Sequence, residues 1–172
     1  MAILFALVYP DQPTAEKAAL SAKGLEEFGY MAILESSIIS KNSKGKIEHH
    51  GERHTVRTGV AAGAVVGGLT GLIFLVPVAG IAAGAAFGGL IGKWAKSGAS
   101  EDFVQFRDQV TRDLQPGGAA LVLIVETDAR DRVIYDLGQY GGILRSTDVS
   151  KEQLAEVQAA LDKVAAGSES SP

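Results

Sequence analysis

The hydrophobic pattern begins with a short apolar run over residues 2–9 that stops at Pro10 and Asp11. Such a run is typical of a buried strand. The residues after Asp11 place Ala18, Ala22 and Leu25 on one helical face as far as Gly29, and they predict a helix. Residues 31–40 and the more polar residues 46–51 predict two further strands joined by a turn over residues 42–45. We expect the polar strand to lie at a sheet edge.

Helical and strand patterns of apolar residues return after residue 98. Ser100 is expected to cap a helix with acidic residues in its first turn. Residues 119–125 and 143–149 predict strands on either side of a short helix over residues 128–137. Ser150 and Gln153 form a capping box for a last helix, and residues 167–172 should fray. The apolar positions of the helix after Ser100 are Phe103, Phe106, Val110 and Leu114.

One internal similarity links the two halves. Residues 33–40 (ILESSIIS) align with residues 143–150 (ILRSTDVS). Val8 precedes Ile33 by 25 residues and Val125 precedes Ile143 by 18, a difference of two helical turns. The pattern suggests one βαβ unit used twice, and it favours an α+β fold, a ferredoxin-like sandwich interrupted near its middle.

This interpretation divides the chain into four parts. Residues 1–56 form the first part of the α+β domain (βαββ), and residues 57–98 form an inserted helical hairpin. Residues 99–166 complete the domain (αβαβα), and residues 167–172 form a disordered tail.

The insertion carries the strongest signal in the chain. No formal charge occurs between Thr58 and Gly92, and two series of glycines spaced four residues apart flank Pro77. Residues four apart share one face of a helix, so each arm would present a stripe without side chains. Glycine costs about 1 kcal/mol relative to alanine in a helix interior, and close helix packing offsets that loss. We therefore predict a glycine-zipper hairpin that drives self-association through Gly59, Gly63, Gly67, Gly71, Gly80, Gly84, Gly88 and Gly92.

The two arms are marginal as membrane spans. They contain 18 residues (59–76) and 15 residues (78–92), whereas a hydrocarbon core needs about 20. The flanking residues favour a membrane, because Arg57, Lys93 and Lys96 with Trp94 are typical of a cytoplasmic membrane interface. The alternative is a soluble oligomer in which the hairpin is buried between subunits.

Composition narrows the functional classes. The chain has no cysteine, which excludes disulfides, thiolate metal sites and thiol nucleophiles. Its net charge of −4 argues against a nucleic-acid partner. No secretory signal precedes residue 10, so we place the bulk of the chain in the cytoplasm.

The chain resembles the DUF1269 family of uncharacterised bacterial proteins, which are often labelled predicted membrane proteins. The resemblance rests on residues 5–9 (FALVY), the glycine zipper, the helix of Phe103 running into residues 114–121 (LQPGGAAL), and residues 141–146 (GGILRS). It implies an α+β domain with a glycine-rich insertion. It implies no activity and no catalytic residues.

One cluster has the character of metal ligands: His49, His50 and His54, with Glu48 and Glu52. Its spacing matches no established zinc pattern, and neighbouring strand residues point to opposite faces. A solvated edge beside the membrane is the default interpretation. Metal binding and a pH-sensitive role stay open alternatives.

No other group of residues predicts a reaction. Residues 88–94 lack the glycine and the Ser or Thr of a phosphate-binding loop. The charged residues 128–136 predict an exposed helix face with a pair between Arg132 and Asp136. The serines at positions 36, 37, 40 and 146 have no histidine–acid partner that the sequence identifies, so no catalytic triad is predicted.

We therefore expect a non-enzymatic homo-oligomer without cofactor or metal, associated with the inner membrane from its cytoplasmic side. Its partners would be copies of itself and membrane lipid. The alternative is a soluble cytoplasmic α+β module that buries the hairpin between subunits and accommodates a small apolar ligand.

Overall fold

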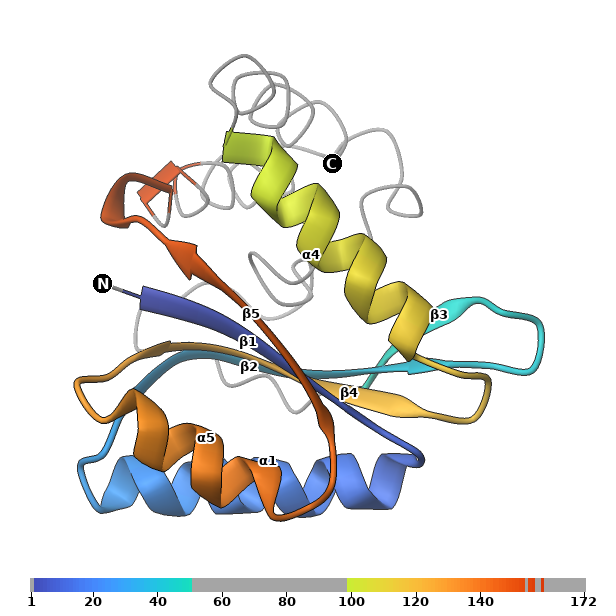
Figure 1. Cartoon of the computed structure of the whole chain (residues 1–172), viewed down its shortest axis with the longest axis horizontal. Helices are drawn as coiled ribbons and strands as arrows, with labels where there is room; N and C mark the ends of the chain where they lie inside the picture. The colour runs from blue at the N-terminus through green and yellow to red at the C-terminus, as the bar shows by residue number, and fades with distance from the viewer. Residues whose placement is uncertain (1, 51–98, 154, 157–158, 160–172) are drawn as a thin grey trace, which may run out of the picture.

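The computed structural model describes residues 2–50, 99–153, 155–156 and 159 (Figure 1). The predicted hairpin over residues 57–98 therefore lies outside the described residues. Much of the predicted last helix does so too, but its described residues 151–153, 155–156 and 159 are helical. The two described stretches share one sheet, because strands from each lie between strands of the other. The predicted α+β class is confirmed.

The sheet has five strands in the order β3-β2-β4-β1-β5, and every neighbouring pair is antiparallel. β1 and β2 both pair with β4, so they run in the same direction on either side of it. β4 and β5 both pair with β1, so they also run in the same direction as each other. The bounds are β1 Ala2–Tyr9, β2 Ala32–Lys41, β3 Ile47–His50, β4 Ala119–Glu126 and β5 Ile143–Val149.

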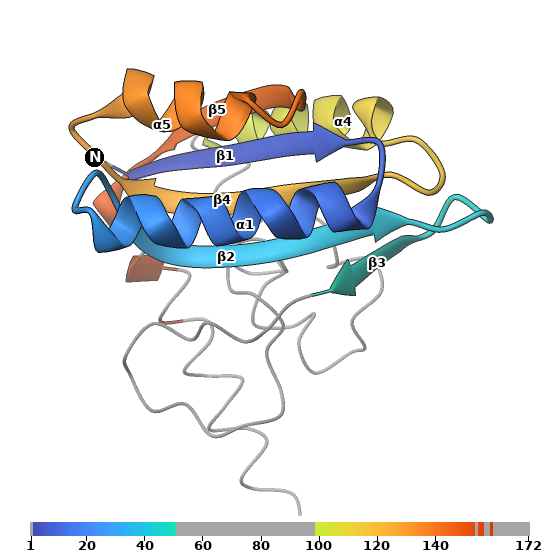
Figure 2. The ribbon, with the colours of Figure 1, turned by 90° about the horizontal axis from the view of Figure 1, so that it is seen from below.

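In the described part of the chain, three helices lie against the two faces of this sheet. α1 (Gln12–Glu27) connects β1 to β2, and α5 (Arg130–Gly138) connects β4 to β5. Both lie on one face, whereas α4 (Ala99–Asp113) lies on the other (Figures 1 and 2). Each predicted element within the described residues is present, and the predicted edge position of the third strand is confirmed by β3.

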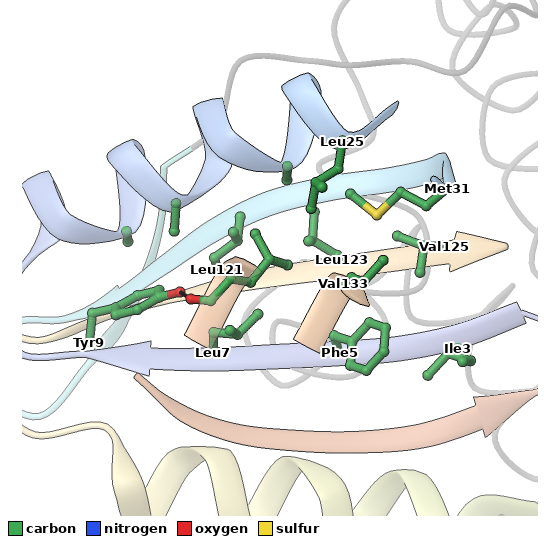
Figure 3. Packing of buried hydrophobic residues seen from close by; sticks show 14 of the residues in the cluster. Ile3, Phe5, Leu7, Tyr9, Leu25, Met31, Leu121, Leu123, Val125 and Val133 are labelled. Atoms are coloured by element: carbon green, nitrogen blue, oxygen red, sulfur yellow. Dashed lines mark hydrogen bonds between the residues drawn. The ribbon is translucent and has the colours of Figure 1, made fainter. Parts of the chain in front are cut away.

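Alternation along β1 explains the layers. All eight of its residues are buried, so both of its faces are covered. Its odd-numbered residues join those of β4 under α1 and α5 (Figure 3). α4 packs a row of buried apolar side chains against the opposite face of the sheet, as the helical spacing predicted. That row consists of Phe103, Phe106, Val110 and Leu114.

Local chemistry fixes most of the element ends. The Asp11 carboxylate accepts hydrogen bonds from the Thr14 backbone N–H (2.8 Å) and hydroxyl (2.7 Å), and caps α1. Gly29, at φ +76°, follows the end of α1 in a conformation that other residues rarely adopt. The predicted cap at Ser100 is wrong, because α4 already includes Ala99. The Ser150 and Gln153 capping box is confirmed by two reciprocal bonds of 2.7 and 3.1 Å.

The internal similarity has a geometric counterpart. Val8 lies opposite Ile143 in the β1–β5 ladder, and Val125 lies opposite Ile33 in the β4–β2 ladder. The two similar segments therefore occupy equivalent places on either side of the central β4–β1 pair. A bulge between Ile33 and Glu35 then shifts the register of β2.

Candidate functional site

Most of the predicted site residues lie outside the described residues. This holds for the eight zipper glycines (Gly59, Gly63, Gly67, Gly71, Gly80, Gly84, Gly88 and Gly92) and for the interface residues Arg57, Lys93, Trp94 and Lys96. It also holds for Glu52 and His54 of the histidine cluster. What the structure does describe is the frame to which that segment is joined, from β3 on one side and α4 on the other.

The β2–β3 hairpin carries the described part of the histidine cluster. The Asn42 side chain organises its turn, because its Oδ1 accepts hydrogen bonds from the backbone N–H groups of Lys44 and Lys46. The same side chain donates from Nδ2 to Glu48 at 2.8 Å. Glu48 and His50 are alternate residues of a strand and therefore share a face.

His50 meets a serine on that face. Its Nε2 lies 2.6 Å from Ser40 Oγ, in a partly buried hydrogen bond between β2 and β3. The sequence had identified no histidine–acid pair for Ser40, and the structure shows the histidine contact that the sequence did not reveal. The Glu48 carboxylate accepts from Asn42, and no bond joins it to the imidazole. Either group can donate in this bond, because the direction depends on the tautomer of the imidazole ring.

The described side chains do not form a metal-binding site. Among the side chains that the structure describes, which do not include those of His49, Glu52 and His54, no three from His, Asp or Glu lie together as a metal site requires. His49 lies opposite Ile39 in the register, whereas His50 lies opposite Ile38. The two histidines are thus successive strand positions, as the sequence predicted.

Two polar contacts hold the C-terminal end of α4. Lys41 Nζ donates to the carbonyl oxygens of Thr111 and Leu114, each at 3.0 Å. From β5, Arg145 donates to the Asp113 carboxylate at 2.7 Å from Nε and 3.2 Å from Nη2. The hydrogen bonds to Asp113, followed by its charge, raise the pKa of Arg145 above its ordinary value. The helix that follows residue 98 is therefore anchored to both β2 and β5.

The charged run around α5 behaves as a solvated face. Arg132 Nε lies 2.6 Å from Asp136 Oδ2, which confirms the predicted i,i+4 pair. This hydrogen bond, followed by the Asp136 charge, raises the pKa of Arg132. The Arg132 guanidinium also lies 5.1 Å from the centre of the Tyr30 ring, a cation–π contact that the sequence did not predict.

Ser37 is the one serine of the set that is fully buried. It is 3% exposed, and its hydroxyl has no hydrogen-bond partner among the described residues. It lies opposite Val122 in the β2–β4 ladder, beyond the bulge. A buried hydroxyl without a partner destabilises the fold locally and offers no nucleophile that solvent can reach. The sequence indicated that successive residues of this strand lie on alternate faces. It did not indicate the bulge that determines which face Ser37 occupies.

The described fold places the chain among the α+β proteins, with a five-stranded antiparallel sheet and helices on both of its faces. Among the helices that the structure describes, none has both the length and the apolar character that a membrane crossing requires. The chain belongs to the DUF1269 family, described as a protein of unknown function, whose model matches residues 60–162. The match begins within the glycine-rich segment and excludes β1, which the resemblance had also used. Comparison with curated proteins and with solved structures found no match.

Proposed function

We propose that the chain is a non-enzymatic, membrane-associated protein that assembles with copies of itself through a glycine-zipper hairpin over residues 57–98. The observation that carries this proposal is the uncharged stretch from Thr58 to Gly92, with its two series of glycines four residues apart. Such small-residue stripes associate by close backbone packing, above all where lipid is the solvent. The flanking Arg57, Lys93, Trp94 and Lys96 suit a membrane interface on the cytoplasmic side of the inner membrane.

The frame around the hairpin is proposed to be a ferredoxin-like domain. The strand order β2-β4-β1-β5 supports this, as do the two crossover helices α1 and α5 on one face. In this arrangement β2 and β4 are neighbours, and the chain between them carries β3, the hairpin and α4. Both elements next to the hairpin belong to one folded unit, since β3 pairs with β2 and α4 is bonded to Lys41 and Arg145. A segment that leaves and returns to one domain suits a hairpin better than a linker.

The proposal assigns no reaction, cofactor or nucleic-acid partner to the chain. The Ser40–His50 bond is the nearest approach to catalytic geometry among the described residues, and we interpret it as a cross-strand contact. Its replacement offers a simple check. Ser40→Ala with His50→Gln should leave both membrane recovery and oligomer size unchanged.

The decisive experiment separates membrane from soluble protein. The full chain is expressed without detergent, membranes are sedimented, and protein in either fraction is sized by light scattering. Recovery in the pellet, with release by detergent as an oligomer, is the expected result. A monodisperse oligomer in the supernatant would overturn the membrane part and leave the soluble module, with the hairpin buried between subunits.

Glycine substitutions then test the zipper itself. Gly63→Leu with Gly67→Leu fills the stripe of the first arm and should abolish assembly through the hairpin, so that the larger oligomers are lost. Ala61→Leu with Val65→Leu adds bulk on the opposite side of the same expected helix and should preserve it. The same oligomer size for the parent and both double variants would show that the glycine stripe is not the interface.

A further inference from the structure

Within the described residues, β5 is an edge strand of seven residues that pairs on one side only. Its partner is β1, and no described strand lies along its other edge. Figure 1 looks onto this edge, with β5 in front of β1. An open edge exposes backbone N–H and C=O groups that bind a further strand. β5 contains neither the proline nor the lysine that often protects such edges.

The opposite edge of the sheet has a different character. The described part of β3 spans Ile47–His50, and three of its residues are the polar Glu48, His49 and His50. Polar and charged side chains on an edge strand hinder its pairing with another chain. The one charge of β5 that lies on the α4 side, Arg145, is already paired with Asp113 and does not repel a neighbour. Strand pairing between two copies of the chain is therefore hindered at the β3 edge and favoured at the β5 edge.

Two opposite charges lie beside the open edge on the face covered by α1 and α5. Arg130 donates from Nη2 to Ser146 Oγ at 3.2 Å, which places its guanidinium over β5. Asp148, two residues further along the same face, is exposed. Neither side chain forms an ion pair within the described part of the chain. An incoming strand of complementary charge would pair with both.

We propose that β5 binds β5 of a second copy of this chain, antiparallel, around a twofold axis at Thr147. In this register Ser146 lies opposite Asp148 of the second copy, so Arg130 of each copy meets a carboxylate of the other. Thr147 lies opposite itself, a favourable cross-strand pair. No like charges face each other over residues 145–149. This β5 interface deepens the proposed self-assembly and rests on it, since it supplies a contact outside the hairpin.

The absence of cysteine from the chain makes a crosslinking test clean. Opposite residues of an antiparallel pair have Cα atoms about 4.5–5.5 Å apart, within the range of about 4.4–6.8 Å that a disulfide spans. The full-length Thr147→Cys variant, oxidised in detergent, should run as a disulfide-linked dimer. Glu48→Cys, on the β3 edge, is the matched control and should stay monomeric on the same gel.

Charge exchange tests the proposed pairing. Arg130→Asp and Asp148→Arg, each in the Thr147→Cys background, place like charges together and should reduce crosslinking by about fivefold or more. The double exchange restores opposite charges and should recover most of the dimer. A purely structural role for either residue would not produce this recovery.

The hairpin variants separate the two interfaces. With Gly63→Leu and Gly67→Leu, the Thr147→Cys crosslink should persist while larger oligomers disappear. Oligomers without any Thr147→Cys crosslink would overturn the β5 interface and leave the zipper intact. A protein that is monomeric throughout would overturn both.

Discussion

Gly142 lies against the ring of Tyr9, at the point where the chain enters β5. A Cβ atom added at Gly142 would lie 2.6 Å from Cε1 and 3.0 Å from Cδ1 of that ring. Tyr9 ends β1 and is only 2% exposed, and its hydroxyl donates to the carbonyl oxygen of Leu137 at 3.3 Å. The ring is therefore held between the end of α5 and the start of β5. Gly142 is needed because no side chain fits beside it.

Gly142→Ala should destabilise the fold by about 1–3 kcal/mol, as overpacking of a filled core does. The measurement is urea unfolding of the full chain followed by circular dichroism. Gly138→Ala is the control, since an added Cβ there meets nothing within 4 Å and alanine is the better helix former. Equal stability of Gly142→Ala and the parent would show that the Tyr9 ring can move aside.

Tyr9 also predicts how stability depends on alkaline pH. Burial, followed by the nearby Tyr140, raises the pKa of its hydroxyl well above the ordinary value of about 10. Above pH 10 the unfolded chain loses this proton while the folded chain keeps it. The stabilisation is therefore complete below that pH and decreases as pH rises, by up to about 1.4 kcal/mol per unit from this group.

Tyr9→Phe removes that contribution. The variant should lose about 1 kcal/mol at neutral pH, because the bond to Leu137 is gone. Its unfolding free energy should then decline less steeply than the parent's between pH 10 and 11.5. Tyr135→Phe, at an exposed position, is the control. Parallel pH profiles for Tyr9→Phe and the parent would contradict this account.

Contacts between near neighbours in the chain were predictable from the sequence. The Asp11 cap and the Ser150–Gln153 box depend on residues three apart, so the residue types alone indicate them. The spacing of Val8, Ile33, Val125 and Ile143 likewise indicated two equivalent βαβ units. Their ladder positions agree with it, because a repeated unit places equivalent residues opposite one another.

Contacts between distant residues were not predictable. The bond between Ser40 and His50 depends on the exact register of the β2–β3 hairpin. Lys41 reaches α4 carbonyls 70 and 73 residues further along the chain. Nothing in the sequence indicates the bulge after Ile33, which determines the face of the sheet on which Ser37 lies. The zipper glycines lie outside the described residues, so their role stays a prediction.

Lys41→Met should destabilise the attachment of α4. The side chain keeps most of its length but no longer donates to Thr111 and Leu114, and these carbonyl oxygens at a helix end lose their partners. A loss of about 1–3 kcal/mol is expected for bonds to a charged donor. Hydrogen exchange should increase in the last turn of α4. Lys44→Met, in the exposed turn of the same hairpin, should change stability by less than about 0.5 kcal/mol.

Arg145 and Asp113 form the second attachment of α4, and a double-mutant cycle isolates it. Arg145→Met and Asp113→Asn should each destabilise the fold, and the double variant should lose less than the sum of the two, because only the first loss breaks the pair. The Asp113 side chain is 17% exposed and bound by two nitrogens, so solvent screens the pair only partly. Arg107 and Asp108 provide the control pair on the same helix, since the Asp108 side chain is 53% exposed. Unfolding at two salt concentrations should give a larger and less salt-sensitive coupling for Arg145–Asp113. Equal couplings for the two pairs would mean that apolar packing, and not this ion pair, holds α4 against β5.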